Sequence, residues 1–180
     1  TGVMTATLNT ESFGYDAQEG HEFYRALRER LEAAPGVVAV SFTSQIPLAF
    51  ATSNGSVWPD GAGVETPSGP GQRDDGKPIQ LTRIGADFFD AMQLPIVRGR
   101  ALDRTDGASA PKVAVVNETF ASRFWPDGSA VGRGFTYGDE HYTIVGVARD
   151  AKYDSLNEET PAYAYFAIEQ AWFPNQVVLV

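Results

Sequence analysis

The carboxylates of this chain include close pairs that could carry acid–base chemistry or bind a cation. Asp103 lies three residues before Asp106, and Asp150 lies four residues before Asp154. Two carboxylates that meet in this way can share a proton or hold calcium. Neither pair has the glycine and the distal glutamate of an EF-hand loop. We therefore interpret them as solvated turn carboxylates and predict no metal site.

The histidines and serines do not form a catalytic arrangement in the sequence. His21 falls in the first turn of a predicted helix and His141 in a predicted hairpin turn, so the two lack the spacing of a metal-ligand pair. Five serines lie outside any Gly-x-Ser-x-Gly elbow: Ser41, Ser44, Ser53, Ser56 and Ser68. We predict no catalytic residue, no cofactor site and no enzyme activity.

Two arginines could recognise a partner. Arg98 and Arg100 flank Gly99 in an extended segment, where alternate side chains point to the same side. Their guanidinium groups could together bind a carboxylate. The alternative, which we favour, is internal pairing with a nearby carboxylate: Asp103, Asp106 or Glu118. Both interpretations remain open at this point.

Three aromatic residues are further candidates for partner contact. Trp58 lies in an apolar island, Val57-Trp58-Pro59, and Trp172 and Phe173 precede another proline. Aromatic side chains concentrate at interface hot spots. The alternative is a side chain that packs its loop on the core, which we favour for Trp58 and leave open for the other two. The complete set of candidate contact residues is Arg98, Arg100, Trp58, Trp172 and Phe173.

Composition limits the classes of function further. The chain has 180 residues, 43% of them hydrophobic, and no cysteine, so it can build a core without disulfides. Its formal net charge is -9, and its 14 basic residues are scattered along the sequence, which argues against a nucleic-acid partner. No run reaches the ~20 apolar residues of a membrane helix. The first residues show no signal-peptide pattern and the last ones no cap, so we expect an excised domain of a larger protein.

The sequence predicts two strands and one helix in the first forty-odd residues. We predict a strand over residues 3–8, a helix that begins after Asp16, and a strand over residues 37–42. Asp16 and Glu19 have the spacing of a capping box, and Pro35-Gly36 ends the helix. Residues 47–78 are rich in glycine, proline and serine and predict a loop or hairpin, where Pro59 argues against a central strand.

The remaining sequence predicts further strands with two short helices. Asn117 is placed to cap the second of these helices. The predicted strands cover residues 79–84, 94–100, 112–116, 133–137, 142–148, 162–168 and 176–180, and a short helix is predicted near residues 87–92. This mixture of elements predicts an α+β fold with a mixed sheet.

Five short segments occur in an order that resembles a known family. They are Pro95 to Arg100, Val113 to Glu118, Arg123 to Pro126, Val131 to Arg133, and Ile144 to Asp150. Together they resemble the MacB-like periplasmic core domain of FtsX-type permeases in ABC transporters. The resemblance covers nearly the whole chain and is most specific over residues 79–166. It implies one extracytoplasmic domain built from a porter-like β-α-β lobe and a smaller, mostly-β lobe.

The resemblance also implies boundaries within that single domain of residues 1–180. Residues 1–46 would form the β-α-β part of the porter-like lobe, and residues 47–78 a glycine- and proline-rich loop or hairpin. Residues 79–161 would form a helix-and-strand lobe, and residues 162–180 would supply return strands to the porter-like lobe. Family members usually continue into another helix and strand of that lobe.

The function implied by the resemblance is mechanical. The domain would lie on the periplasmic side of the inner membrane and follow movements that ATP hydrolysis drives on the other side. Implied partners are the ATP-binding subunit or domain of the transporter, a periplasmic adaptor or exported substrate, and a second copy in a homodimer; no nucleic acid is expected. The alternative is a free-standing periplasmic module that binds a ligand or protein, which would show a deep apolar pocket.

Overall fold

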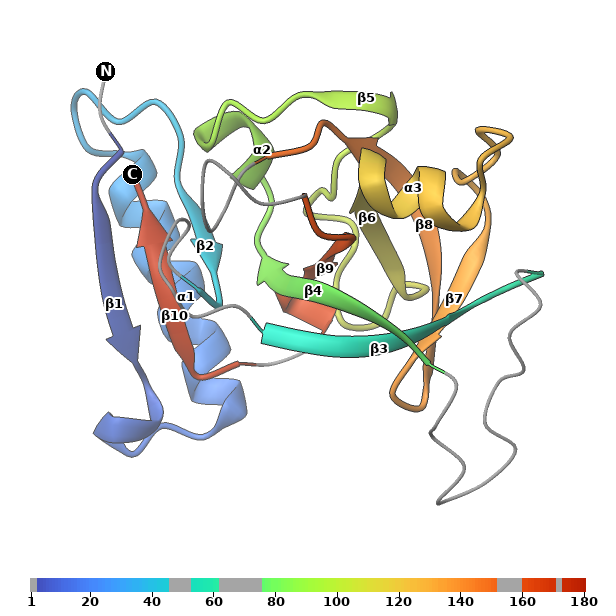
Figure 1. The fold of residues 1–180 in the computed structure, drawn as a ribbon. Coiled ribbons are helices and arrows are strands. Elements are labelled where there is room, and N and C mark those ends of the chain that lie inside the picture. Colours follow the sequence, from blue (N-terminus) through green and yellow to red (C-terminus); the bar gives the residue numbers. More distant parts are fainter. Residues whose placement is uncertain (1–2, 46–52, 62–75, 152–159, 171–172) are drawn as a thin grey trace.

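The computed structural model describes residues 3–45, 53–61, 76–151, 160–170 and 173–180. Figure 1 shows a mixed α+β fold in which strands predominate, as the sequence predicts. The elements in chain order are β1 (Thr5–Asn9), η1 (Glu11–Phe13), α1 (Ala17–Glu32), β2 (Ser41–Thr43), β3 (Ser53–Pro59), β4 (Lys77–Ile84), α2 (Phe88–Ala91), β5 (Ile96–Gly99), β6 (Val113–Asn117), α3 (Glu118–Phe124), β7 (Gly134–Tyr137), β8 (Glu140–Ala148), β9 (Tyr163–Ala167), η2 (Ile168–Gln170) and β10 (Asn175–Leu179).

Six strands close into a barrel. They pair in the order β4-β3-β7-β8-β6-β9, and β9 then pairs with β4 again, so the circuit has no free edge. The β4–β9 and β6–β8 pairs are parallel and the others are antiparallel, which confirms the mixed sheet. Closure of this kind satisfies backbone hydrogen bonds that an open edge would leave unpaired.

Side chains that alternate in direction along the barrel strands form two separate cores, one inside the barrel and one outside it. Ala114, Val116, Ala164 and Phe166 face the barrel interior, where the aromatic rings of α3 and of β7 join them. Their neighbours along the same strands point outward, into a second core that includes Phe88, Phe89 and one face of β10. The period of two along β6 and β9 therefore lets these strands bury both faces.

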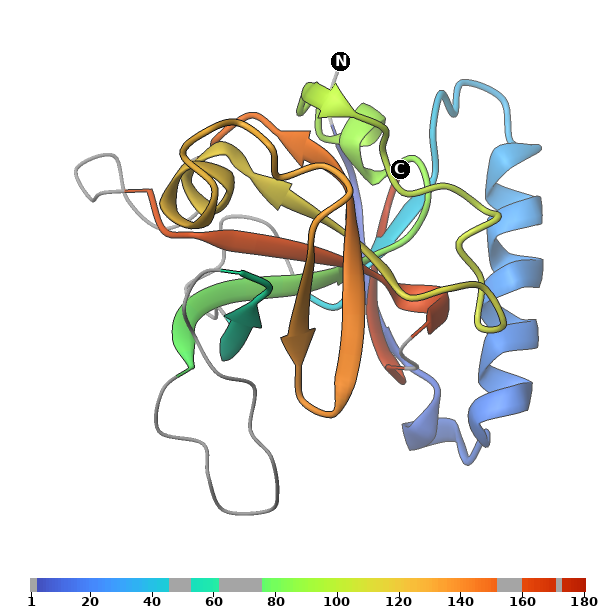
Figure 2. The ribbon, with the colours of Figure 1, turned by 90° about the vertical axis from the view of Figure 1, so that its right-hand side faces the viewer.

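A small layer stands beside the barrel, and we call it the α1 unit: helix α1 with strands β1, β2 and β10. The strands pair in the order β1-β10-β2, and α1 covers one face of them (Figure 2). The capping box forms as predicted, since Asp16 accepts from the Glu19 backbone and Glu19 from the Asp16 backbone. The helix buries Tyr24 against Phe42.

The α1 unit joins the barrel through a short junction. β2 pairs with β4 at one position, Thr43 opposite Ile84, next to a hydroxyl–hydroxyl hydrogen bond of 3.2 Å between Thr43 and Thr82. Two further backbone bonds, Ser44 N–H to the Arg83 carbonyl and Gly85 N–H to the Phe42 carbonyl, complete the junction. The sheet is therefore narrowest where the α1 unit meets the barrel.

Three local predictions are wrong. The strand predicted over residues 37–42 is limited to Ser41–Thr43, because Val38 points to solvent with 97% of its surface exposed. β3 is a central strand in spite of Pro59; its pairing with β4 ends at Val57, so the proline pairs only with β7. His141 lies in β8, because the turn of the β7–β8 hairpin is limited to Gly138 and Asp139.

Candidate functional site

The structure separates the two arginines. Arg100 forms a bidentate ion pair with Asp106, at 2.7 and 2.8 Å, and lies 3.4 Å from Asp103. Arg98 instead donates to the Gly128 carbonyl at 3.2 Å. Gly99 between them has a φ of +71°. This left-handed residue interrupts the strand alternation, so the guanidinium groups do not converge on one carboxylate.

Gly99 also lets two backbone segments approach each other closely. A β-carbon at Gly99 would collide with the Val145 carbonyl, and one at Gly146 would collide with the Arg100 carbonyl. The paired glycines thus have the close-packing role that the sequence indicates. They hold β5 against β8 and fix the direction in which Arg100 leaves toward Asp106.

The aromatic candidates have different surroundings. Trp58 is 5% exposed, but its neighbour Val57, and not Trp58, belongs to the core inside the barrel. Phe173 is half-buried, with the Arg83 guanidinium 5.7 Å from its ring centroid. Trp172 lies outside the described residues. Partner contact through these residues stays a prediction.

The other polar candidates are engaged in local structure. Asp150 accepts from the Thr119 backbone and hydroxyl at 3.0 and 2.8 Å, and so holds the start of α3. His141 bonds Asp60 at 2.9 Å. Asp154 lies outside the described residues, and within the described part of the chain no three His, Cys, Asp or Glu side chains come together as metal ligands would.

One spacing escaped the sequence analysis. Ser109 and Lys112 form a Ser-x-x-Lys pattern, which some hydrolases use for nucleophilic chemistry. Here the Lys112 ammonium donates to the Gln170 carbonyl at 2.8 Å. The Gln170 side chain in turn accepts from Val113 N–H and donates to the Pro111 carbonyl. The lysine therefore fastens the loop before β6 to η2.

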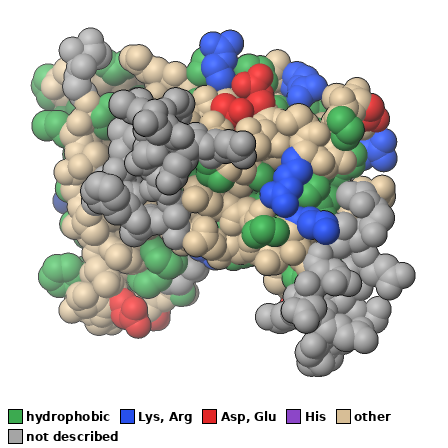
Figure 3. All heavy atoms as spheres, viewed as in Figure 1, with side chains coloured by type: hydrophobic (Ala, Val, Ile, Leu, Met, Phe, Trp, Pro, Cys, Tyr) green, Lys and Arg blue, Asp and Glu red, His purple; other side chains and the backbone are tan. Residues whose placement is uncertain are grey.

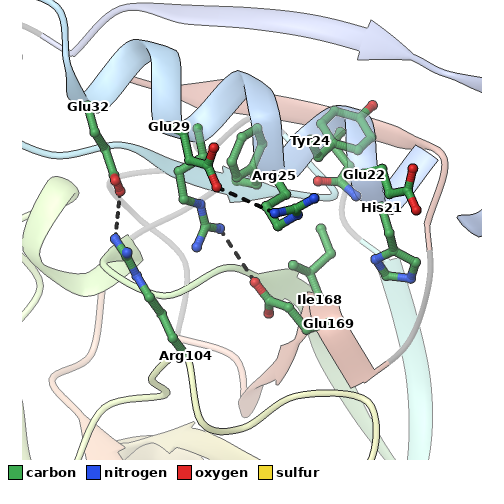
Figure 4. Close-up of a pocket in the computed structure, with 12 residues that line it drawn as sticks. His21, Glu22, Tyr24, Arg25, Glu29, Glu32, Arg104, Ile168 and Glu169 are labelled. Atoms are coloured by element: carbon green, nitrogen blue, oxygen red, sulfur yellow. Dashed lines mark hydrogen bonds and ion pairs between the residues drawn. The ribbon is translucent and has the colours of Figure 1, made fainter. Parts of the chain in front are cut away.

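A hollow lies beside α1, and we call it the α1 cavity (Figure 4). It has a volume of about 450 Å³ and separates α1 from η2 and the loop after β5. Tyr24, Phe42 and Ile168 supply its apolar lining. The charged residues that line it are His21, Glu22, Arg25, Arg28, Glu29, Glu32, Arg104 and Glu169.

Two ion pairs cross the α1 cavity from the helix to the rest of the molecule (Figure 4). Arg28 reaches Glu169 of η2 at 3.4 Å, and its guanidinium lies 5.1 Å from the Phe42 ring centroid. Helical spacing sets Arg28 apart from the apolar stripe of Phe23, Leu27 and Leu31, and yet its side chain is only 14% exposed. Burial raises the pKa of the Glu169 carboxyl, although the nearby Arg28 lowers it in part.

A second hollow continues beyond the end of the helix. It has a volume of about 520 Å³ and is lined by residues 37–40 together with Asp87 and Asp90. Arg104 pairs with Glu32 at 2.6 Å and with Asp87 at 3.2 Å, and both Arg104 and Glu32 line the two hollows. The Arg104–Glu32 ion pair therefore lies at the boundary between the two hollows. We call the two hollows together the α1 groove.

The described surface away from the groove is mixed in charge. On the face in Figure 3, Lys and Arg side chains are spread over the barrel side, with acidic side chains between those at its upper edge. A nucleic-acid site would need a continuous basic surface. No helix among the described residues has both the length and the apolar character needed to span a bilayer.

Comparison with known proteins identifies the family. The model of the MacB-like periplasmic core domain family matches residues 4–178. The macrolide export ATP-binding/permease protein MacB 1/2 of Paracoccus denitrificans (strain Pd 1222) is 29% identical over 69 residues, which are 38% of this chain. The match spans only 10% of that relative's length.

Two solved structures share the fold. The periplasmic region of MacB from Actinobacillus actinomycetemcomitans aligns with a TM-score of 0.61 at 14% identity, over 99% of this chain and 74% of that one. The extracellular domain of the noncanonic ABC-type transporter YknZ from Gram-positive bacteria aligns with a TM-score of 0.58 at 14% identity, over 99% and 83%.

Proposed function

Because the chain belongs to the MacB-like periplasmic core domain family, we propose that it is the non-catalytic periplasmic domain of an ABC transporter permease in the inner membrane. In this role it relays conformational change, driven by ATP hydrolysis at an ATP-binding subunit or domain, to a periplasmic adaptor or an exported substrate. The observation that carries the proposal is the family match over residues 4–178. A homodimer of the whole permease is compatible with it.

The arrangement of β1 and β10 supports attachment at one side of the domain. The two strands are antiparallel neighbours, and Met4 and Val180 exchange backbone hydrogen bonds of 2.8 and 3.0 Å. Both strands therefore lead to the same side of the domain (Figure 1). Two neighbouring membrane helices could hold the α1 unit from that side and move it directly.

The junction supports a relay through relative movement. The α1 unit is joined to the barrel by the short β2–β4 pairing, by the apolar contacts of Val177 and Leu179, and by the polar bridges that involve Arg28 and Arg104. Polar bridges of this kind exchange partners more readily than a close-packed apolar core deforms. We propose that the barrel moves as one body and that the α1 unit is the part that the membrane segments displace.

Topology mapping of the parent protein tests the proposed function. The reading frame is extended on both sides of residues 1–180, and each apolar segment that flanks them is fused to periplasmic and cytoplasmic reporters. We expect a span of ~20 apolar residues on each flank, with the domain reporting from the periplasm. Absence of flanking spans, or a cytoplasmic report, would overturn the proposal.

A further inference from the structure

We infer that the α1 groove binds a basic segment of a partner protein, with an arginine or lysine side chain of that segment seated between Phe42 and Glu169. The inference rests on the proposed function, because it specifies the surface through which the domain would meet its partner. It commits to one occupant, an extended peptide segment that carries positive charge.

Charge complementarity is the first argument. Six carboxylates line the groove, against three guanidinium groups and His21. The carboxylates are Glu22, Glu29, Glu32, Glu169, Asp87 and Asp90, and the guanidinium groups belong to Arg25, Arg28 and Arg104. The carboxylates exceed the guanidinium groups by three, and this excess would repel an anionic partner. A cationic segment instead meets an excess of negative charge.

The surroundings of Arg28 are the second argument. Its guanidinium lies over the Phe42 ring and beside Glu169, so an aromatic face and a half-buried carboxylate already hold a cation there. The pair is long, at 3.4 Å, whereas charge-assisted hydrogen bonds to carboxylates are usually about 2.7–2.9 Å. An incoming guanidinium or ammonium can therefore replace Arg28 and make a shorter bond to Glu169.

The shape of the groove is the third argument. Its two hollows, of about 450 and 520 Å³, meet at the Arg104–Glu32 pair, the first beside α1 and the second beyond the C-terminal end of the helix. α1 has 16 residues, which corresponds to a length of about 24 Å. An extended peptide of about seven residues spans this length. The groove thus suits a chain segment better than a compact small molecule.

A labelled peptide tests the inference directly. The probe is an acetylated and amidated octapeptide that alternates alanine and arginine, and the matched control replaces arginine with citrulline, which has a similar shape without the charge. Binding to the 180-residue chain is measured by fluorescence anisotropy, and the site is located by amide chemical shifts. We expect shifts in α1, β2 and η2 with the arginine peptide, and no comparable binding of the citrulline peptide.

Three variants distinguish the groove from general attraction to an acidic protein. Glu169→Gln should weaken binding of the arginine peptide about tenfold or more, because it removes the half-buried carboxylate. Glu11→Gln removes the same unit of charge at an exposed site in η1 and should leave the affinity unchanged. Arg28→Gln should tighten binding about tenfold, since it vacates the place on Phe42. Equal effects of Glu169→Gln and Glu11→Gln would overturn the inference, whether or not Arg28→Gln folds.

The failure of this inference differs from the failure of the proposed function. Topology mapping can place the domain between membrane spans while the arginine peptide does not bind the groove. In that case the permease role stands and the basic partner is rejected. If the peptide binds the groove but flanking spans are absent, the site stands as that of a free periplasmic binding module.

Discussion

The barrel and the α1 unit are built from the same kinds of side chain but are held in different ways. Sixteen buried residues form the core inside the barrel, and strand closure surrounds them on all sides. Five buried residues form the core between α1 and its strands, together with half-buried neighbours such as Leu27 and Leu31. The core of the α1 unit is smaller, and two ion pairs add to the apolar contacts that β10 makes with the rest of the molecule.

The comparison is informative because β10, a strand of the α1 unit, contacts both α1 and the core outside the barrel. Val178 faces α1, and its neighbours Val177 and Leu179 face the core outside the barrel. β10 also pairs with β1 and β2. A displacement of the α1 unit therefore reaches the barrel through the apolar contacts of β10, the short β2–β4 pairing and two ion pairs.

The largest expected effect comes from truncation of the barrel core. Phe135→Ala removes a ring that is fully buried among Phe120, Tyr142 and Phe166, and should cost about 3–5 kcal/mol of unfolding free energy. Leu27→Ala truncates a half-buried side chain of α1 and should cost less unfolding free energy, about 1–2 kcal/mol. Urea denaturation measures both. An equal cost at the two sites would contradict the difference between the regions.

The next effect concerns the polar anchor of the barrel. The Asn117 side chain accepts from Phe120 and Tyr163 backbone N–H groups and donates to the Pro161 carbonyl, all at 2.9 Å. Asn117→Ala removes the α3 cap together with the buried hydrogen bonds to the Tyr163 N–H and the Pro161 carbonyl, so we expect a loss of about 2–3 kcal/mol. The exposed Asn54→Ala in β3 is the control and should change the unfolding free energy little.

A smaller effect tests the bridges across the α1 groove. Arg28→Ala leaves Glu169 without its guanidinium and should cost roughly 1 kcal/mol. Arg25→Ala breaks an exposed pair with Glu29 on the same helix and should cost at most about 0.5 kcal/mol. Hydrogen exchange should quicken in α1 and remain unchanged in the barrel for Arg28→Ala. Faster exchange spread over both regions would show that they open together.

The smallest effect is a pH dependence at Glu169. Burial raises the pKa of its carboxyl above the ordinary value of 4.5, so the folded chain holds this proton more tightly than the unfolded chain does. The resulting stabilisation is present below the unfolded-state pKa and is lost as the pH rises through the folded-state value. Glu169→Gln should therefore gain Tm relative to wild type as the pH rises from about 4 to 7.

The control for this titration is a carboxylate on the α1 wall of the cavity, opposite Glu169. Glu29→Gln changes an exposed side chain, so its Tm difference from wild type should vary less over the same pH range. A Tm difference for Glu169→Gln that is constant with pH would mean that the carboxyl is not perturbed by burial.

Sequence reasoning works best where local chemistry decides the structure. The capping box at Asp16 and Glu19 and the cap at Asn117 both form, because each depends on residues three apart in the chain. The sequence correctly predicts β6 and β9 as buried strands, since Val113 to Val116 and Tyr163 to Ala167 are continuous apolar runs. These elements establish the α+β class before any contact between distant segments is known.

Long-range contacts explain what the sequence does not reveal. Barrel closure depends on the β4–β9 pair, whose residues lie about eighty positions apart in the chain. A local sequence pattern therefore does not predict the closure. Arg28 looks like a solvent-facing residue on a helical wheel, but Glu169 and Phe42 cover it in space. The α1 groove was missed for the same reason, since its walls come from α1, β2, η2 and the loop after β5.

A distance measurement between the two regions tests the central claim most directly. These 180 residues contain no cysteine, so Ala26→Cys on α1 and Asp139→Cys in the β7–β8 turn can carry one spin label each in the full-length permease once any cysteines outside them are replaced. Both positions are exposed. We predict that the distance distribution differs between the nucleotide-free and the vanadate-trapped permease, while a pair placed within the barrel stays constant. An unchanged distance between α1 and the barrel would contradict the relay.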